Sequence, residues 1–314
     1  MTHTSIRGVR VLLALALVAA SAALTVGCGG GSGGASTGTG TGMISGTAVK
    51  GPVSGATVTA YAISNGAKGD QLGSAQTDSN GGFTITVGPY SGPVMLQMHG
   101  GSYMDEATGT RMTMLDADQL TCVIPSVTVS AGSAMTGIQI TPLTSMAQAW
   151  AQNMAGGMSA ANITTANEHM GAAYLGSGVD ILMTHAIDPT VAGSANGVSV
   201  ESKNYGMLLA AMSQEASDLG MTTSSSAMIT AMMDDASDGM MDGRMGSTAI
   251  SLSGMGGMMG GGNMMPTAAT SQLVTTMTTF INNLSANRSG VTSVSEMQTL
   301  MNKLTQLATS GGQL

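Results

Sequence analysis

Methionine is the most unusual residue of this chain and the first whose chemistry needs an explanation. The 314 residues include 30 Met. Within residues 239–265, a Gly-rich stretch without a helical period, lie eight of them: Met240, Met241, Met245, Met255, Met258, Met259, Met264 and Met265. Because such a glycine-rich loop builds little core, we expect some of these thioethers to reach solvent. Thioethers are soft ligands that select Cu(I), so the loop is a candidate Cu(I) site.

Two alternatives to copper binding remain open for this loop. Methionine oxidises reversibly to its sulfoxide, so the loop could instead scavenge oxidants outside the cytoplasm, or it could be a loosely packed insertion without a function of its own. A second population of methionines follows helical or strand periods and is expected in the core, where Met fills irregular gaps. It consists of Met112, Met114, Met207, Met212, Met228, Met232, Met277, Met297 and Met301.

Carboxylates gather just before and within the methionine loop. Asp235, Asp238 and Asp242 stand among glycines, a composition that suits a hard, oxygen-ligated cation such as Ca²⁺. Their spacing is not that of an EF-hand loop, and Asp also hydrogen-bonds its own backbone in turns. Ca²⁺ binding and a simple turn are therefore both open. Asp105 and Glu106 form a similar, weaker pattern.

No pattern of a known catalytic class is found in the sequence. The histidines after the first segment are far apart, there is no Gly-x-Ser-x-Gly elbow, and the glycine runs lack the Lys of a phosphate-binding loop. Cys122 lies in an apolar run and is expected to be a buried small hydrophobe. Nine Lys and Arg against 17 Asp and Glu exclude a nucleic-acid partner. We therefore expect a protein that is not an enzyme.

Residues 1–27 have the pattern of an export signal. Arg7 and Arg10 precede an apolar run, Val11–Ala20, that is too short to span a bilayer. The following Leu24–Cys28 resembles the lipobox of bacterial lipoproteins. The resemblance implies that Cys28 becomes the mature N-terminus and carries the lipid.

A Gly/Ser/Thr tether, residues 28–42, follows the signal. Lipoproteins retained in the inner membrane often carry Asp directly after the cysteine, so the resemblance, with Gly29 at this position, implies the outer membrane. We therefore expect a chain of the cell envelope that contacts the membrane through its lipid.

Hydrophobic periodicity predicts the elements behind the tether. With 43% apolar residues the chain can bury a core despite only 8% charged residues. Over residues 43–140 alternating apolar residues predict strands, among them 56–63, 82–87, 94–98 and 111–115. Over residues 141–314 the helical period predicts helices at 143–155, 164–175, 201–219, 225–237, 268–286 and 293–309. The predicted fold class is α+β, an antiparallel β-sandwich followed by an irregular α-helical domain.

Two sets of motifs carry family resemblances. Ser45–Val58 followed by Thr77–Ile85 resembles the carboxypeptidase regulatory-like domain, which implies a transthyretin-like sandwich without catalytic activity. Gly100–Gly109, Thr141–Thr144 and Asp238–Gly243 resemble segments of an uncharacterised group of bacterial lipoproteins. We expect a non-catalytic envelope lipoprotein acting as a structural or binding module. Its partners would be the membrane and an envelope protein or glycan, and it would have no cofactor unless the loops bind Cu(I) or Ca²⁺.

Overall fold

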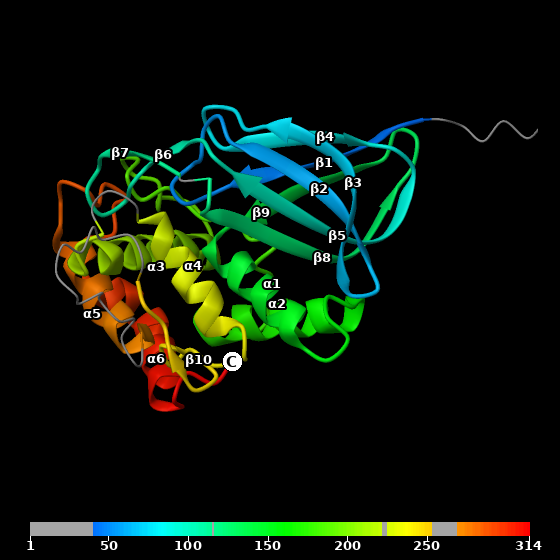
Figure 1. Cartoon of the computed structure of the whole chain (residues 1–314). Coiled ribbons are helices and arrows are strands. Elements are labelled where there is room, and N and C mark those ends of the chain that lie inside the picture. Colours follow the sequence, from blue (N-terminus) through cyan, green and yellow to red (C-terminus); the bar gives the residue numbers. More distant parts are fainter. Residues whose placement is uncertain (1–39, 115, 222–224, 253–268) are drawn as a thin grey trace, which may run out of the picture. The chain divides into compact units, whose positions relative to one another are not determined.

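The N-terminal strands form two main sheets in a computed structural model that describes residues 40–114, 116–221, 225–252 and 269–314 (Figure 1). A three-stranded sheet has the order β4-β1-β9, and a four-stranded sheet has the order β3-β2-β5-β8. Their strands are β1 (Gly42–Ala48), β2 (Thr57–Ser64), β3 (Ala67–Gln76), β4 (Gly82–Val87), β5 (Tyr90–His99), β8 (Gln119–Val129) and β9 (Ala134–Ile140). Two small hairpins add β6 (Ser102–Met104) with β7 (Arg111–Thr113), and β10 (Arg244–Met245) with β11 (Thr248–Ala249).

One strand pair differs from the expected antiparallel arrangement. The four-stranded sheet is antiparallel throughout, and β1 pairs antiparallel with β4, but β1 and β9 run parallel. No hairpin joins β1 to β9, because all the other strands of these sheets lie between them in the chain, so the direction of the pair is not set by a tight turn. Their close approach needs a glycine: a Cβ on Gly46 would lie 1.9 Å from the Ile138 carbonyl oxygen.

A hydrophobic cluster joins the two sheets. It combines Ile44, Ile85 and Ile138 of the three-stranded sheet with Leu96 and Leu120 of the four-stranded one, all fully buried. In β4 the buried residues alternate with exposed threonines, the period that predicted this strand. Burial of each large aliphatic side chain stabilises the fold by about 1.5–3 kcal/mol, so this cluster is a main source of stability for the strands.

Helices follow from Pro142 onward. They are α1 (Pro142–Asn153), α2 (Ala160–Tyr174), α3 (Val200–Asp218), α4 (Ser226–Ala236), α5 (Ala269–Asn282), the short 3₁₀ helix η1 (Val294–Met297) and α6 (Gln298–Thr309). All six predicted helices are confirmed to within a few residues, except that α5 ends early and the last one begins with η1. A capping box of Ser293 and Glu296 begins η1. No helix among the described residues is long and apolar enough to cross a membrane.

The four-stranded sheet supports the helices through β8 (Figure 1). Val123 of β8 belongs to the same hydrophobic cluster as Met146 of α1 and Ala166 of α2. The neighbouring Thr121 carbonyl oxygen accepts a hydrogen bond of 2.8 Å from Thr144 Oγ1 at the start of α1. Strand β8 therefore packs against the other sheet with one face and against helices with the other, which explains its continuous apolar run.

Buried methionines make up much of this helical core. All nine methionines that periodicity placed in the core are buried, which confirms that prediction. Cys122 is also confirmed as a buried side chain, fully enclosed between the sheets, and burial raises the pKa of its thiol. A buried neutral thiol is a poor nucleophile, so Cys122 has a packing role.

Candidate functional site

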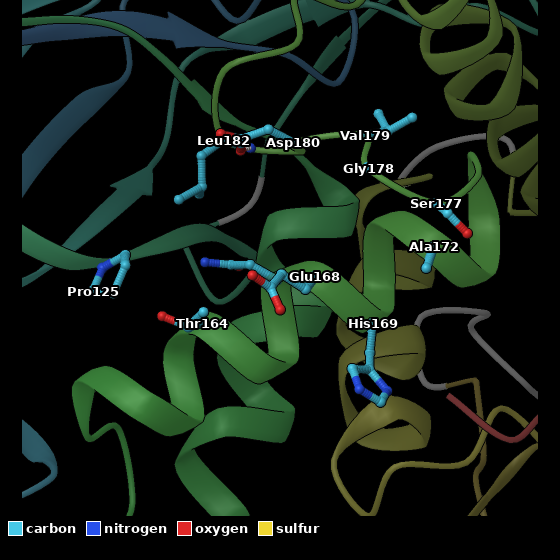
Figure 2. A pocket seen from close by; sticks show the side chains of 11 residues that line it. Pro125, Thr164, Glu168, His169, Ala172, Ser177, Gly178, Val179, Asp180 and Leu182 are labelled. Atoms are coloured by element: carbon cyan, nitrogen blue, oxygen red, sulfur yellow. Dashed lines mark hydrogen bonds between the residues drawn. The ribbon is translucent and has the colours of Figure 1, made fainter.

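A pocket of about 500 Å³ lies between α2, the segment that follows it and β8 (Figure 2). Its wall combines apolar side chains with two carboxylates from different segments, Glu168 of α2 and Asp180 of the following turn. The lining residues are Pro125, Thr164, Asn167, Glu168, His169, Ala172, Ser177, Gly178, Val179, Asp180 and Leu182.

Asn167 leaves a hydrogen-bond acceptor unused in this wall. Its Nδ2 donates to the Val123 carbonyl oxygen at 3.0 Å, which fixes the amide against β8. Its Oδ1 is buried and has no hydrogen-bond partner among the residues that the structure describes. Leaving a buried acceptor unpaired costs about 1–3 kcal/mol, so this oxygen marks a position where a ligand donor would be favourable.

The orientation of Asp180 and His169 is set by their own neighbours. Asp180 Oδ1 accepts a hydrogen bond from the Leu182 backbone N–H at 2.9 Å. The His169 ring lies edge-to-face with Trp150 of α1, with the ring centroids 5.6 Å apart. Because Trp150 is the single tryptophan of the chain, its fluorescence is a natural reporter of changes at this pocket.

A second polar cluster, which we name the Lys50 cluster, is buried where the strands meet the helices. It consists of Lys50, Tyr103, Asp105, Glu106, Ser213 and Ser225. Lys50 Nζ lies 3.0 Å from Glu106 Oε2, 3.5 Å from Asp105 Oδ2 and 2.6 Å from Ser213 Oγ. Three segments far apart in the sequence thus converge on one ammonium group.

The remaining oxygens of the Lys50 cluster are also satisfied. Glu106 Oε1 accepts from the Gly51 backbone N–H at 2.7 Å, and Ser213 donates to Glu106 Oε2 at 2.7 Å. Ser225, the residue before α4, donates to Asp105 Oδ2 at 2.7 Å and lies 2.8 Å from the Tyr103 hydroxyl. Asp105 and Glu106 were a weak candidate for a cation site, and Lys50 supplies the counter-charge there. A lysine inside the apolar run Val49–Val53 was the signal that sequence reasoning missed.

The charges of the Lys50 cluster shift the pKa values of its own members. Burial alone would lower the pKa of Lys50, but the neighbouring negative charges, that of Glu106 first, raise it above its ordinary value. Burial would raise the pKa of Asp105, but Lys50 and the hydrogen bonds from Ser225 and Thr108 hold it below its ordinary value. Lys50 is therefore charged and donates to Ser213, so it does not serve as the base that a serine nucleophile requires.

The three candidate calcium ligands take part in turns after α4. Asp235 Oδ1 accepts backbone N–H bonds from Asp242, Gly243 and Arg244 at 3.0, 2.8 and 3.1 Å. Asp238 accepts from the backbone N–H groups of Met240 and Gly246, and Asp242 from that of Arg244. In the described ranges no three His, Cys, Asp or Glu side chains are grouped so that they could hold a metal ion. The turn interpretation therefore accounts for these hydrogen bonds, and calcium binding by this set stays a prediction.

The candidate copper ligands are found in different environments. Met241 is fully buried in the helical core, Met240 is half-buried, and Met245 of β10 is 52% exposed. The start of the loop is more ordered than expected, because β10 and β11 form a short hairpin. Met255, Met258, Met259, Met264 and Met265 lie outside the described residues, as does Cys28.

Comparisons with known proteins give no family for this chain. No protein-family model matches the chain, and no curated protein matches it.

Proposed function

We propose that this chain is a non-catalytic lipoprotein of the cell envelope, anchored through acylated Cys28, that acts as a binding module. The lipobox-like Leu24–Cys28 and the glycine-rich residues 28–42 support the anchor and the tether. Two buried acyl chains are sufficient for stable membrane attachment. Gly29 stands where lipoproteins retained in the inner membrane often carry Asp, which supports the outer membrane as its location.

The proposal includes a transthyretin-like sandwich of the carboxypeptidase regulatory-like type. Its support is the division of the strands into a three-stranded and a four-stranded sheet with one common hydrophobic cluster. The motif Thr77–Ile85 leads into β4, where the resemblance expects a strand. In this proposal the sandwich is the platform that supports the helices and their pocket.

The pocket beside α2 is the observation that carries the binding function. Glu168 and Asp180 supply negative charge, and Asn167 Oδ1 is an unpaired acceptor. Ionised carboxylates accept hydrogen bonds and do not donate them, while Pro125 and Val179 provide apolar contact. A small protonated amine with an aliphatic part is the ligand class that this lining fits.

The absence of catalysis in this proposal is supported by the Lys50 cluster. Ser213 and Lys50 have the residue types of a nucleophile and a base, but both are buried and Lys50 is held in its charged form. Their hydrogen bonds instead connect β-strand segments to α3. A structural role explains every contact of the cluster.

A fluorescence titration tests the binding function. We expect 1,4-diaminobutane to change Trp150 emission in the full chain, whereas butane-1,4-diol, of the same length but uncharged, leaves it unchanged. Asp180→Asn and Glu168→Gln would each weaken the response about tenfold, since a charge-assisted contact contributes about 1.5–3 kcal/mol. Asp116→Asn, a surface change outside the pocket lining, is the matched control. No response to the diamine in the wild type would contradict the proposed ligand class.

Cu(I) binding at residues 239–265 is a second candidate function, favoured by one observation. Met245 is exposed on a hairpin at the start of the loop, so at least one thioether is available to a metal ion from solvent. Anaerobic titration with Cu(I) against a competing chelator tests it. Competition that is lost in a Met→Leu variant of the loop would support copper binding, and no competition would remove this candidate.

A further inference from the structure

Among the described residues, three helices each bring into the helical core a polar side chain with at least one unpaired oxygen atom. The Tyr174 hydroxyl ends α2, Glu215 lies in α3, and Asp235 lies near the end of α4. All three residues are fully buried. Within the part of the chain that the structure describes, the Tyr174 hydroxyl, both Glu215 carboxylate oxygens and Asp235 Oδ2 have no hydrogen-bond partner. Four buried oxygen atoms of these three described side chains are thus unsatisfied.

The three groups are close enough to act on one another electrostatically. Burial, followed by the charge of Asp235 and then that of Glu215, raises the pKa of Tyr174. The pKa of Glu215 rises to about 8 through burial and the negative charges of Asp218 and Asp235. Burial also raises the pKa of Asp235 to about 7, although three backbone N–H groups bond to its Oδ1. The charges of Asp218 and Asp235 are both negative, so they do not compensate the charge of Glu215.

Uncompensated buried carboxylates are among the most costly features of a protein interior. An ionised carboxylate in an apolar environment requires a counter-charge or a proton, and buried polar atoms of native proteins nearly always have a partner. When both are ionised, the two carboxylates carry a formal charge of −2, which one divalent cation neutralises. Hard divalent cations such as Ca²⁺ take carboxylate and neutral oxygen ligands, and these are the atoms present.

We propose that Glu215 and Asp235 bind one hard divalent cation of the Ca²⁺ class in the helical core, with the Tyr174 hydroxyl as an adjacent neutral oxygen. The site differs from the loop set of Asp235, Asp238 and Asp242, because it uses the inward-facing Oδ2 of Asp235. Asp235 Oδ1 meanwhile holds the backbone of residues 242–244. A cation at Oδ2 therefore also fixes the start of the methionine-rich segment relative to α3 and α4. This proposal does not rest on the amine pocket.

Cation binding to the full chain tests the proposal directly. The protein is stripped with a chelator and titrated with CaCl₂ and with MgCl₂ by calorimetry, with thermal unfolding measured in parallel. We expect one equivalent of Ca²⁺ to bind and to raise the unfolding temperature, since a ligand that binds only the folded state stabilises it. Glu215→Gln keeps the shape of the side chain but removes its charge, and we expect it to weaken binding at least about tenfold. Asp70→Asn, an exposed change on β3 outside both sets of candidate calcium ligands, is the control and should bind as the wild type does.

The stability of Glu215→Gln separates lost binding from lost folding. Because a neutral amide needs no counter-ion, this variant should unfold in chelator at or above the temperature of the chelated wild type. If it does not fold, Tyr174→Phe takes its place, and weaker Ca²⁺ binding by that variant supports the site. Absence of Ca²⁺ binding by the wild type, or equal binding by a folded Glu215→Gln variant, overturns the proposal. In that case a shared proton, and not a metal ion, compensates the two carboxylates.

Discussion

Lys50 Nζ and Ser213 Oγ lie 2.6 Å apart although 163 positions separate them in the chain. The contact joins the segment after β1 to the middle of α3, and the carboxylates of Asp105 and Glu106 complete it from the hairpin loop between β6 and β7. A fully satisfied buried network of this kind is sensitive to the loss of any one member. The Lys50 cluster therefore joins strand segments to the helices by polar contacts, whereas β8 joins them by hydrophobic contacts.

Lys50→Met should destabilise the protein strongly. The substitution removes the counter-charge and leaves Asp105 and Glu106 buried without a cation, a change that costs about 3–5 kcal/mol. Denaturant unfolding followed by Trp150 fluorescence measures the change in the free energy of unfolding. Lys68→Met is the control, because Lys68 is exposed and we expect a change below about 1 kcal/mol. An equally small effect of both substitutions would show that the buried ion pairs do not hold the helices to the strands.

Asp105 should make stability depend on pH in the acid range. Its pKa is lower in the folded state than the ordinary value of 3.8, so the unfolded chain takes up a proton first as the pH falls. The stabilisation by Asp105 is therefore present above about pH 4 and is lost as the pH falls through the folded-state pKa. The measurement is the difference in unfolding free energy between wild type and Asp105→Asn from pH 7 to pH 2, in which other titrating groups cancel. A difference that is constant over this range would contradict the assigned ion pair.

Periodicity predicted the elements with one buried face and failed for the others. Alternation located β4, and the helical stripes located the six helices, since one-sided burial leaves a pattern in the sequence. Strand β3 was not predicted because its residues are mostly exposed and show no alternation. Strand β8 was not predicted as a whole because it is buried on both faces, and its apolar run alone does not distinguish a strand from a buried helix.

The sequence did not reveal which polar side chains contact one another in the folded protein. Asp105 and Glu106 were noticed as a pair, but their partner Lys50 is 55 or more residues away and only the packing of sheet and helix brings them together. The same holds for Glu215, which a helical stripe places on a buried face without saying what it meets. By contrast, Asp238 and Asp242 bond to backbone within a few residues, and the turn interpretation of their local sequence described these bonds.

Cys122 should not react with a water-soluble thiol reagent in the folded protein. It is fully buried, and burial raises the pKa of its thiol, so little reactive thiolate is present or accessible. The number of thiols that react in denaturant then reports on the anchor. One reactive thiol per chain from native cells indicates that Cys28 is acylated, whereas two indicate that both cysteines are unmodified. Rapid labelling of Cys122 without denaturant would contradict its burial between the sheets.

Methionine oxidation should separate Met245 from Met241, two residues of the same short segment. Met245 is 52% exposed on β10, whereas Met241 is fully enclosed in the helical core and its backbone N–H bonds to the Gly312 carbonyl oxygen at 2.8 Å. Mild hypochlorite followed by peptide mass spectrometry should therefore show sulfoxide at Met245 well before Met241. The buried methionines of α3, Met207 and Met212, provide the internal reference for protection.

If residues 255–265 oxidise as early as Met245 while the fold persists, oxidant scavenging gains support, because the oxidised side chains are then ones that the core does not need. Oxidation of Met245 no faster than of Met207 would instead show that its exposure has no chemical consequence, and would weaken both the scavenging and the Cu(I) hypotheses.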